Sequence, residues 1–239
     1  MAKNIPFTGE RFLPWMNAPQ IAYEHWHRYL YALSFVQDRT VLDVACGEGY
    51  GSFFLSRNAR KVVGVDVDRE IVRHASEKYV PQSPDKLSFV VGTCNRIPID
   101  VNESFDVIVS FETLEHLTET DQTEFLKEVK RLIKPTGLFI ISTPDKLNYS
   151  DVPKTSNEFH QKELYVKEFE ALLAGHFARY ELMYQSVVVG SYLWQPSDPA
   201  KALHIHGIDL SESGFVPADK DMDPTYVIAL CSDGPLPES

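Results

Sequence analysis

The sequence predicts an α/β fold: a doubly wound, mostly parallel sheet of seven strands, with an N-terminal helical cap and a lid insertion. Three observations lead to this class. Continuous apolar runs, such as those at 107–109 and 138–141, suit strands that are buried on both faces. Amphipathic patterns of helical period separate these runs, as in a parallel sheet with crossover helices. A glycine-rich turn follows the first run directly.

Composition and charge restrict the class of protein. With 239 residues, 44% of them apolar, the chain can bury one sizeable core, so we expect a single domain over 1–239. The net charge of −11 would repel a phosphate backbone, and we expect no nucleic-acid partner. The three cysteines are far apart and odd in number, which predicts neither a disulfide framework nor a metal site. Without an apolar run of signal-peptide or membrane-spanning length, we expect a cytoplasmic protein that does not insert into membranes.

The elements follow in order from the N-terminus. Apolar side chains at helical spacing predict a helix over 20–36 whose aromatic face packs on the core: Tyr23, Trp26, Leu30 and Leu33. The βαβ pattern after it comprises a strand at 40–45, a helix at about 50–56, a strand at 61–66 and a helix at about 68–79. Further strands are predicted at 87–91, 105–110 and 137–143, with a helix before Pro135.

The C-terminal third is less regular. Residues 145–160 are polar and rich in turn formers, which is typical of a lid or a plain connection. A helix over 162–174 should end at Gly175. Strands are predicted at 177–189 and near 225, with irregular chain over 190–224 between them, long enough to cover a site or an interface.

The most informative stretch is the turn after the first strand. Glycines 47, 49 and 51 alternate there, so the backbone can approach a ligand closely and aim helix N–H groups at it. A dinucleotide-binding turn has the spacing G-x-G-x-x-G, whereas this chain has G-x-G-x-G after Asp43. An oxidoreductase is therefore disfavoured, although it stays an alternative.

This stretch resembles the D-x-G-x-G-x-G signature of class I S-adenosylmethionine-dependent methyltransferases, with Ala45 in place of the usual first glycine, and the resemblance covers about 40–145. It implies a Rossmann-like fold, S-adenosyl-L-methionine as cofactor and S-adenosyl-L-homocysteine as product. The predicted parts are an N-terminal cap helix (1–38), a cofactor-binding core (39–145), and an acceptor-side lid with the C-terminal strands (146–239). The residues implied to contact the amino-acid part of the cofactor are Asp43, Ala45, Gly47 and Gly49.

The adenosine part is expected at the ends of the second and third strands. Asp66 ends the second strand, where a carboxylate can accept hydrogen bonds from both ribose hydroxyls. Asp68 is better placed to cap the next helix, which leaves Asp66 for the ligand. By the resemblance, Val67 presses on the adenine. After the third strand the family often has Gly-Asp, but this chain has Thr93 and Cys94, so one of these or a backbone group must take that role.

The acceptor is expected at the end of the fourth strand, because ligands bind at the carboxyl ends of strands in such sheets. Phe111 and Glu112 would face the cofactor, and Glu115 the acceptor. His116 is a candidate general base, since histidine titrates near neutral pH, but it could equally be structural. His160 is the second candidate. We expect no metal.

A narrower resemblance rests on Thr8-Gly9-Glu10-Arg11-Phe12, on Glu24-His25 with His27-Arg28-Tyr29, and on Asn157-Glu158-Phe159-His160 with Glu163-Leu164. These segments are similar to methyltransferases of bacterial surface-polysaccharide synthesis. The similarity implies that the N-terminal helix covers the cofactor and that Tyr23, His27 or Arg28 meets ligand, although each could also be plain helix surface.

The leading hypothesis is O-methylation of a sugar hydroxyl in bacterial glycan biosynthesis, such as that of an O-antigen. N-methylation of an amino sugar, methylation of another small metabolite, and an inactive cofactor-binding scaffold are the alternatives. A homodimer and association with glycan-assembly enzymes are further expectations.

Overall fold

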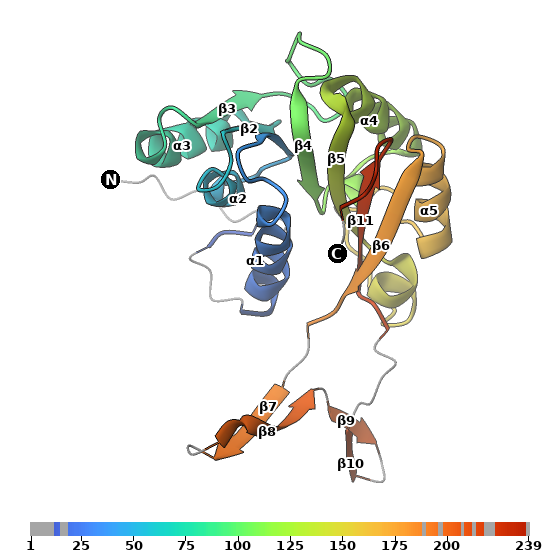
Figure 1. Ribbon diagram of the computed structural model, residues 1–239. Helices are drawn as coiled ribbons and strands as arrows, with labels where there is room; N and C mark the ends of the chain where they lie inside the picture. Colours follow the sequence, from blue (N-terminus) through green and yellow to red (C-terminus); the bar gives the residue numbers. More distant parts are fainter. Residues whose placement is uncertain are drawn as a thin grey trace.

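The computed structural model describes residues 12–14, 19–187, 190–195, 198–206, 208–211, 214–217 and 223–237. Its centre is a seven-stranded sheet in the order β3-β2-β1-β4-β5-β11-β6 (Figure 1). Five neighbouring strands are parallel, and β11 runs antiparallel to β5 and β6. The predicted doubly wound, mostly parallel sheet is therefore confirmed. The strands are β1 (Thr40–Val44), β2 (Lys61–Asp66), β3 (Leu87–Val91), β4 (Phe105–Phe111), β5 (Ile133–Pro144), β6 (Arg179–Gln185) and β11 (Tyr226–Ser232).

Helices cover both faces of this sheet. They are α1 (Pro19–Leu33), α2 (Tyr50–Leu55), α3 (Arg69–Tyr79), α4 (Glu119–Leu132) and α5 (Val166–Ala174). Alternate residues of one strand serve opposite faces, because Val41 packs in the core under α1, α2 and α3, whereas Leu42 packs in the core under α4 and α5. The short turns are η1 (Val80–Gln82), η2 (Leu114–His116) and the π-helical turn η3 (Leu147–Asp151).

The buried face of α1 differs from the predicted one. The aromatic face was expected in the core, yet Tyr23 is 69% exposed and Leu30 is also exposed. The buried side chains of α1 are instead Glu24, Arg28, Tyr29 and Ala32. The apolar pattern was misleading because two charged side chains of this helix are buried at the site described below, where they have polar partners.

The segment between β6 and β11 was expected to be irregular, and this was wrong. It forms two antiparallel two-stranded sheets that lie away from the main sheet in Figure 1. Their strands are β7 (Gly190–Gln195), β8 (Asp198–His206), β9 (Ile208–Ser211) and β10 (Gly214–Pro217). Within the described ranges, no helix is both long and apolar enough to cross a membrane.

Candidate active site

The glycine turn after β1 has the strained backbone that close approach to a ligand requires. Ala45, Gly47 and Gly49 all have positive φ, at 58°, 54° and 90°. A side chain at Gly49 would also meet Ala75 and Phe89 at 2.8 and 2.9 Å, so only glycine fits there. The turn connects β1 to α2 at the carboxyl edge of the sheet, and its own bonds hold it there: the N–H groups of Cys46 and Gly49 donate to the carbonyls of Val65 and Cys46 at 2.9 and 3.1 Å.

Asp43 lies beneath this turn with its side chain buried. Ser52 Oγ donates to it at 2.6 Å, and the hydroxyl of Tyr29 from α1 lies 3.2 Å from both carboxyl oxygens. Burial raises the pKa of Asp43 to about 7, and the nearby charge of Asp66 adds to the rise, whereas the two hydroxyl donors oppose it. The ionised form is therefore costly unless a cation approaches.

Asp66 ends β2 and holds the turn. Its two oxygens each accept one backbone N–H, from Gly47 and from Asp68, both at 2.9 Å. Each carboxylate oxygen has a further lone pair for a ligand hydroxyl. Asp68 caps α3 as predicted, accepting from the backbone of Glu70. Val67 is 67% exposed beside it, which is the position that an adenine contact requires.

The residues after β3 differ from each other in environment. Thr93 is exposed and pairs with Arg96 in an isolated bridge. Cys94 is partly buried against the core, and burial raises the pKa of its thiol to about 11. Of the two, Thr93 is therefore the more accessible to a ligand, and both contacts stay predictions.

A buried charged cluster lies where β4 ends. Glu112 has a φ of 51°, in the left-handed region, and its carboxylate accepts from Ser142 Oγ at 2.6 Å. The guanidinium of Arg28 reaches it from α1, with Nη1 3.5 Å from Oε1. Arg28 is only 1% exposed, and its Nε donates to Gln185 at 2.8 Å. Its carbon Cζ lies 4.4 Å from the centroid of the Tyr226 ring. Such a strained residue with a buried cation beside it is typical of a functional site.

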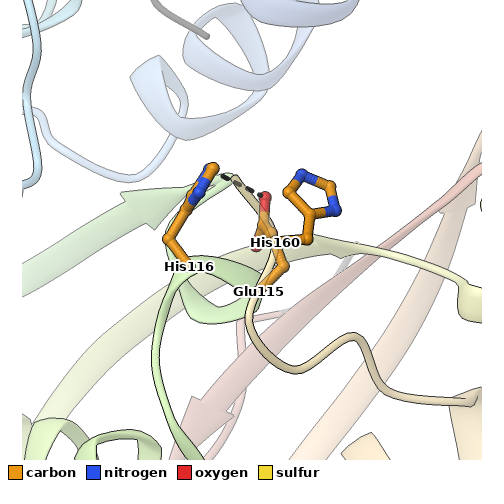
Figure 2. A group of neighbouring side chains, drawn as sticks. All are labelled: Glu115, His116 and His160. Atoms are coloured by element: carbon orange, nitrogen blue, oxygen red, sulfur yellow. Dashed lines mark ion pairs between the residues drawn. The ribbon is translucent and has the colours of Figure 1, made fainter. Parts of the chain in front are cut away.

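The structure brings together Glu115, His116 and His160, as Figure 2 shows. Nε2 of His116 lies 3.9 Å from Oε1 of Glu115, and the two imidazole rings meet edge to face with centroids 5.0 Å apart. Glu115 is buried, and its pKa is raised well above the usual range, chiefly by burial and then by the charge of Glu112. The two predicted catalytic histidines are therefore neighbours.

His160 is held by three side chains. Its Nδ1 lies 2.6 Å from the Glu163 carboxylate, so Nδ1 donates and Nε2 is the acceptor. The Asn157 amide nitrogen lies 3.0 Å from Nε2, and this orientation is fixed because Asn157 Oδ1 accepts from the backbone of Phe159. The Tyr149 ring stacks on the imidazole at a centroid distance of 5.4 Å.

A cavity of about 750 Å³ opens beside this stack. It is lined by α1, by the η3 segment and its following loop, and by the start of β11, through Glu24, Asn148, Tyr149, Pro153, Thr155, Ser156, Asn157, Glu158, Phe159, Thr225 and Tyr226. Tyr226 pairs with Pro144, the last residue of β5, so the cavity lies at the carboxyl edge of the sheet. The predicted lid thus lines a cavity with polar groups and aromatic faces.

The other predicted acceptor-side residues are scattered. Arg28 faces the interior, whereas Tyr23 and His27 are exposed on the opposite side of α1. Phe111, predicted to contact the cofactor, packs its ring against that of Tyr29, with centroids 5.1 Å apart, and its contact with the cofactor stays a prediction. Residues 8–11, part of the narrower resemblance, lie outside the described residues.

Comparison with known proteins identifies the core. Residues 41–137 match the model of a methyltransferase domain. A probable S-adenosylmethionine-dependent methyltransferase of Mycolicibacterium smegmatis is 33% identical over 178 residues, 71% of this chain and 63% of the relative. Residues 41–137 are a methyltransferase domain. The name of that relative gives S-adenosylmethionine as its methyl donor. The chain spans less than two thirds of that relative's length.

Two further relatives agree with this methyltransferase domain. A ubiquinone biosynthesis O-methyltransferase of Bradyrhizobium diazoefficiens is 33% identical over 103 residues, 43% of this chain and 39% of the relative. The crystal structure of YcgJ from Bacillus subtilis superposes with a TM-score of 0.61 at 18% identity, covering 87% of this chain and 99% of that one, which shows the shared fold. None of these three names mentions a sugar.

The residues at the turn of the methyltransferase domain fit this cofactor. A buried carboxylate with a raised pKa, Asp43, suits the ammonium group of the amino-acid part. The carboxylate of the amino-acid part can approach the turn closely because Gly47 and Gly49 have no side chains. The carboxylate of Asp66, which also accepts from Gly47 N–H, can accept hydrogen bonds from the ribose hydroxyls. When bound, the sulfonium supplies an activated methyl group. These residue contacts are predictions, which the following experiments test.

Ala45→Gly is expected to raise the free energy of unfolding by about 0.5–1 kcal/mol. Ala45 is exposed at φ 58°, where a Cβ costs about 1–2 kcal/mol, partly offset by the larger entropy of unfolded glycine. Urea denaturation measures the change. The matched control is Ala171→Gly in exposed, helical α5, which should lose about 1 kcal/mol. Equal destabilisation by both changes would contradict the strain at Ala45.

The affinity for S-adenosylhomocysteine is expected to rise about tenfold between pH 6 and pH 8. Asp43 has a pKa of about 7, so at pH 6 it is mostly protonated and must lose its proton to pair with the ligand ammonium. Isothermal titration at both pH values, in two buffers of different ionisation enthalpy, measures the affinity and the released proton. In Asp43→Asn the pH dependence should vanish. A wild-type affinity that is the same at both pH values would rule out this contact.

Sequence reasoning missed several residues of the site. Tyr29, which donates to Asp43, was included only as part of the narrower resemblance, and Gln185 beside Arg28 was not singled out by any pattern. Glu24 and Arg28 are four residues apart on α1, a spacing that could have been read as one buried polar face. Tyr226 reaches the site only because β11 reverses direction between β5 and β6, which no local pattern encodes.

Proposed function

We propose that the protein uses S-adenosylmethionine to O-methylate a hydroxyl of a small polar acceptor, a sugar of a bacterial glycan or its precursor. The cavity beside His160 is the observation that carries this proposal. Its volume of about 750 Å³ is in the range of small-molecule sites. Its lining combines carboxylates, amides and hydroxyls with the faces of Tyr149 and Tyr226, and such groups suit the hydroxyls and the apolar ring face of a sugar.

The acceptor oxygen attacks the methyl carbon in line with the leaving sulfur. The new C–O bond takes its electron pair from the acceptor oxygen, the C–S bond electrons return to sulfur, and the hydroxyl proton leaves. Most of the rate comes from alignment of donor and acceptor. The proton leaves at the cluster of Glu115, His116 and His160, because this cluster adjoins the cavity through Tyr149 and Asn157.

The test has two steps. Isothermal titration with S-adenosylhomocysteine should give micromolar binding without knowledge of the acceptor. Transfer of labelled methyl groups is then measured with nucleotide sugars, free sugars, amino sugars and a hydroxylated quinone. Methylation of a sugar hydroxyl supports the proposal. Methylation of an amino group or of the quinone overturns the acceptor class, and binding without transfer to any acceptor favours a scaffold.

A further inference from the structure

We infer that Glu115, His116 and His160 form a binding site for a divalent first-row transition-metal ion. Each residue offers one ligand atom, and the three atoms all lie within 4.8 Å of one another. Figure 2 shows the ring of His160 with one nitrogen turned toward Glu115 and His116 and the other turned away. The metal's role in catalysis rests on the proposed function, but its binding does not.

The backbone fixes these ligands before any ion arrives. Glu115 and His116 stand at the end of η2, whereas His160 belongs to the loop after η3. The backbone carbonyl of Glu115 accepts the N–H groups of Gln161 and Lys162 at 2.8 and 3.1 Å. The side-chain amide of Gln122, buried under both segments, donates to the carbonyls of Leu114 and Lys162 at 2.9 Å. These hydrogen bonds join the segment of Glu115 and His116 to the segment of His160, although 45 residues separate Glu115 from His160 in the sequence.

Both imidazoles have the outer partners that metal ligands have. A ligating histidine usually donates its other N–H to a carboxylate or a backbone carbonyl, which fixes the ring and its tautomer. Here Nδ1 of His116 lies 3.1 Å from the carbonyl oxygen of Phe159, and Nδ1 of His160 lies 2.6 Å from Glu163. Each ring therefore presents Nε2 as the lone-pair atom. General base catalysis needs only one histidine, whereas a metal site uses two imidazoles that are each oriented in this way.

The burial of the Glu115 carboxylate also favours a bound cation. Glu115 is 1% exposed and accepts a hydrogen bond of 3.2 Å from the Thr143 hydroxyl. A buried carboxylate is costly in its ionised form unless a cation is near, and the guanidinium of Arg28 pairs with Glu112. An ion bound by Glu115 would supply that cation.

The ligand set indicates the kind of ion. Two imidazole nitrogens and one carboxylate suit zinc, manganese, iron or cobalt, whereas magnesium and calcium prefer oxygen ligands alone. Bonds of about 2.0–2.2 Å place ligand atoms about 3.3–3.6 Å apart. His116 Nε2 and Glu115 Oε1 must therefore approach by a few tenths of an ångström from 3.9 Å, and a pair of ligand atoms as far apart as 4.8 Å by about 1.2–1.5 Å. The ion must also displace the Asn157 amide from His160 Nε2, where it lies at 3.0 Å.

A three-residue site leaves coordination positions open toward the cavity. An acceptor hydroxyl bound there would have a lowered pKa, as metal-bound water has. It would lose its proton to water, and its oxygen would then form the new bond to the methyl carbon. In this state the two histidines are ligands and not bases.

The experiment is titration of the full chain, without a histidine tag and after treatment with a chelator, with Co²⁺ while visible absorption is recorded. We expect one equivalent to give the bands of cobalt with nitrogen and oxygen ligands. Glu115→Gln and His116→Ala should each weaken binding at least tenfold, whereas the matched control His176→Ala, outside the cluster, should not. Mn²⁺ and Zn²⁺ should displace the Co²⁺, and Mg²⁺ should not.

S-adenosylhomocysteine affinity is measured on every variant, so that loss of cobalt binding in a protein that still binds the cofactor product reports the metal site and not misfolding. Equal cobalt binding by wild type and both cluster variants, or a thiolate charge-transfer band, would overturn the metal site. That outcome leaves the proposed methyl transfer standing. Absence of S-adenosylhomocysteine binding in the wild type would instead overturn the proposed function.

Discussion

Asp66→Ala is expected to weaken S-adenosylhomocysteine binding by about ten- to a hundredfold. Charge-assisted hydrogen bonds to the ribose contribute about 1.5–3 kcal/mol. The substitution also removes the acceptor of the Gly47 N–H at 2.9 Å, so the turn under the amino-acid part of the ligand loses an anchor. Both effects act in the same direction, and isothermal titration measures their sum.

Asp68→Ala is the matched control for this change. Asp68 lies two residues further on and caps α3, so its loss should cost about 1 kcal/mol of folding stability. It should nevertheless leave the affinity within about twofold, because its carboxylate bonds to Glu70 and Ile71 rather than to the turn. If Asp66→Ala binds as tightly as Asp68→Ala does, Asp66 is not the ribose ligand.

His160→Ala and His116→Ala are each expected to lower turnover about a hundredfold or more, with S-adenosylhomocysteine affinity within about twofold of wild type. Loss of a group that removes the acceptor proton typically costs 10²–10⁴ in rate. The effect is the same in direction whether the imidazole takes the proton or holds an ion that acidifies the hydroxyl. Methyl transfer at saturating acceptor measures it, with His176→Ala as control.

The two histidines should also depend on each other. Their rings are 5.0 Å apart and both face Glu115, so the double variant should lose little more than either single one. Full additivity of the two losses would show that they act independently. Full turnover in both single variants would remove the cluster from the chemistry and favour an amine acceptor.

The core of the fold was predictable because its signals are local. Apolar runs such as Val107–Val109 and the glycine turn each report their own conformation, and the order of β1 to β5 follows from the alternation of strands and helices. Asp68 could be predicted as a cap for the same reason, since its partners are the next residues along the chain.

The acceptor side was less predictable because it depends on contacts distant in sequence. Arg28 meets Gln185 and Tyr226, which lie 157 and 198 residues further along the chain. The sequence pattern of α1 is the same whether Arg28 is buried against such distant partners or exposed to solvent. The buried face of α1 was therefore misassigned. The strands at 190–217 were missed because the apolar residues there occur in short runs that are interrupted by glycine, proline, serine and aspartate.

The two ends of the segment between β6 and β11 are joined by hydrogen bonds, at a neck formed by residues 185–186 and 223–225. Thr225 donates its backbone N–H to the carbonyl of Gln185 at 3.1 Å, and the Ser186 hydroxyl bonds to the Asp223 carbonyl at 3.0 Å. These bonds fix the register of β6 and β11 independently of the segment that connects them. Lengthening that segment therefore costs only the loop-closure entropy, which grows slowly with loop length. Because the neck borders the acceptor cavity at Thr225, substrate preference can diverge there during evolution while the donor half of the molecule keeps its structure.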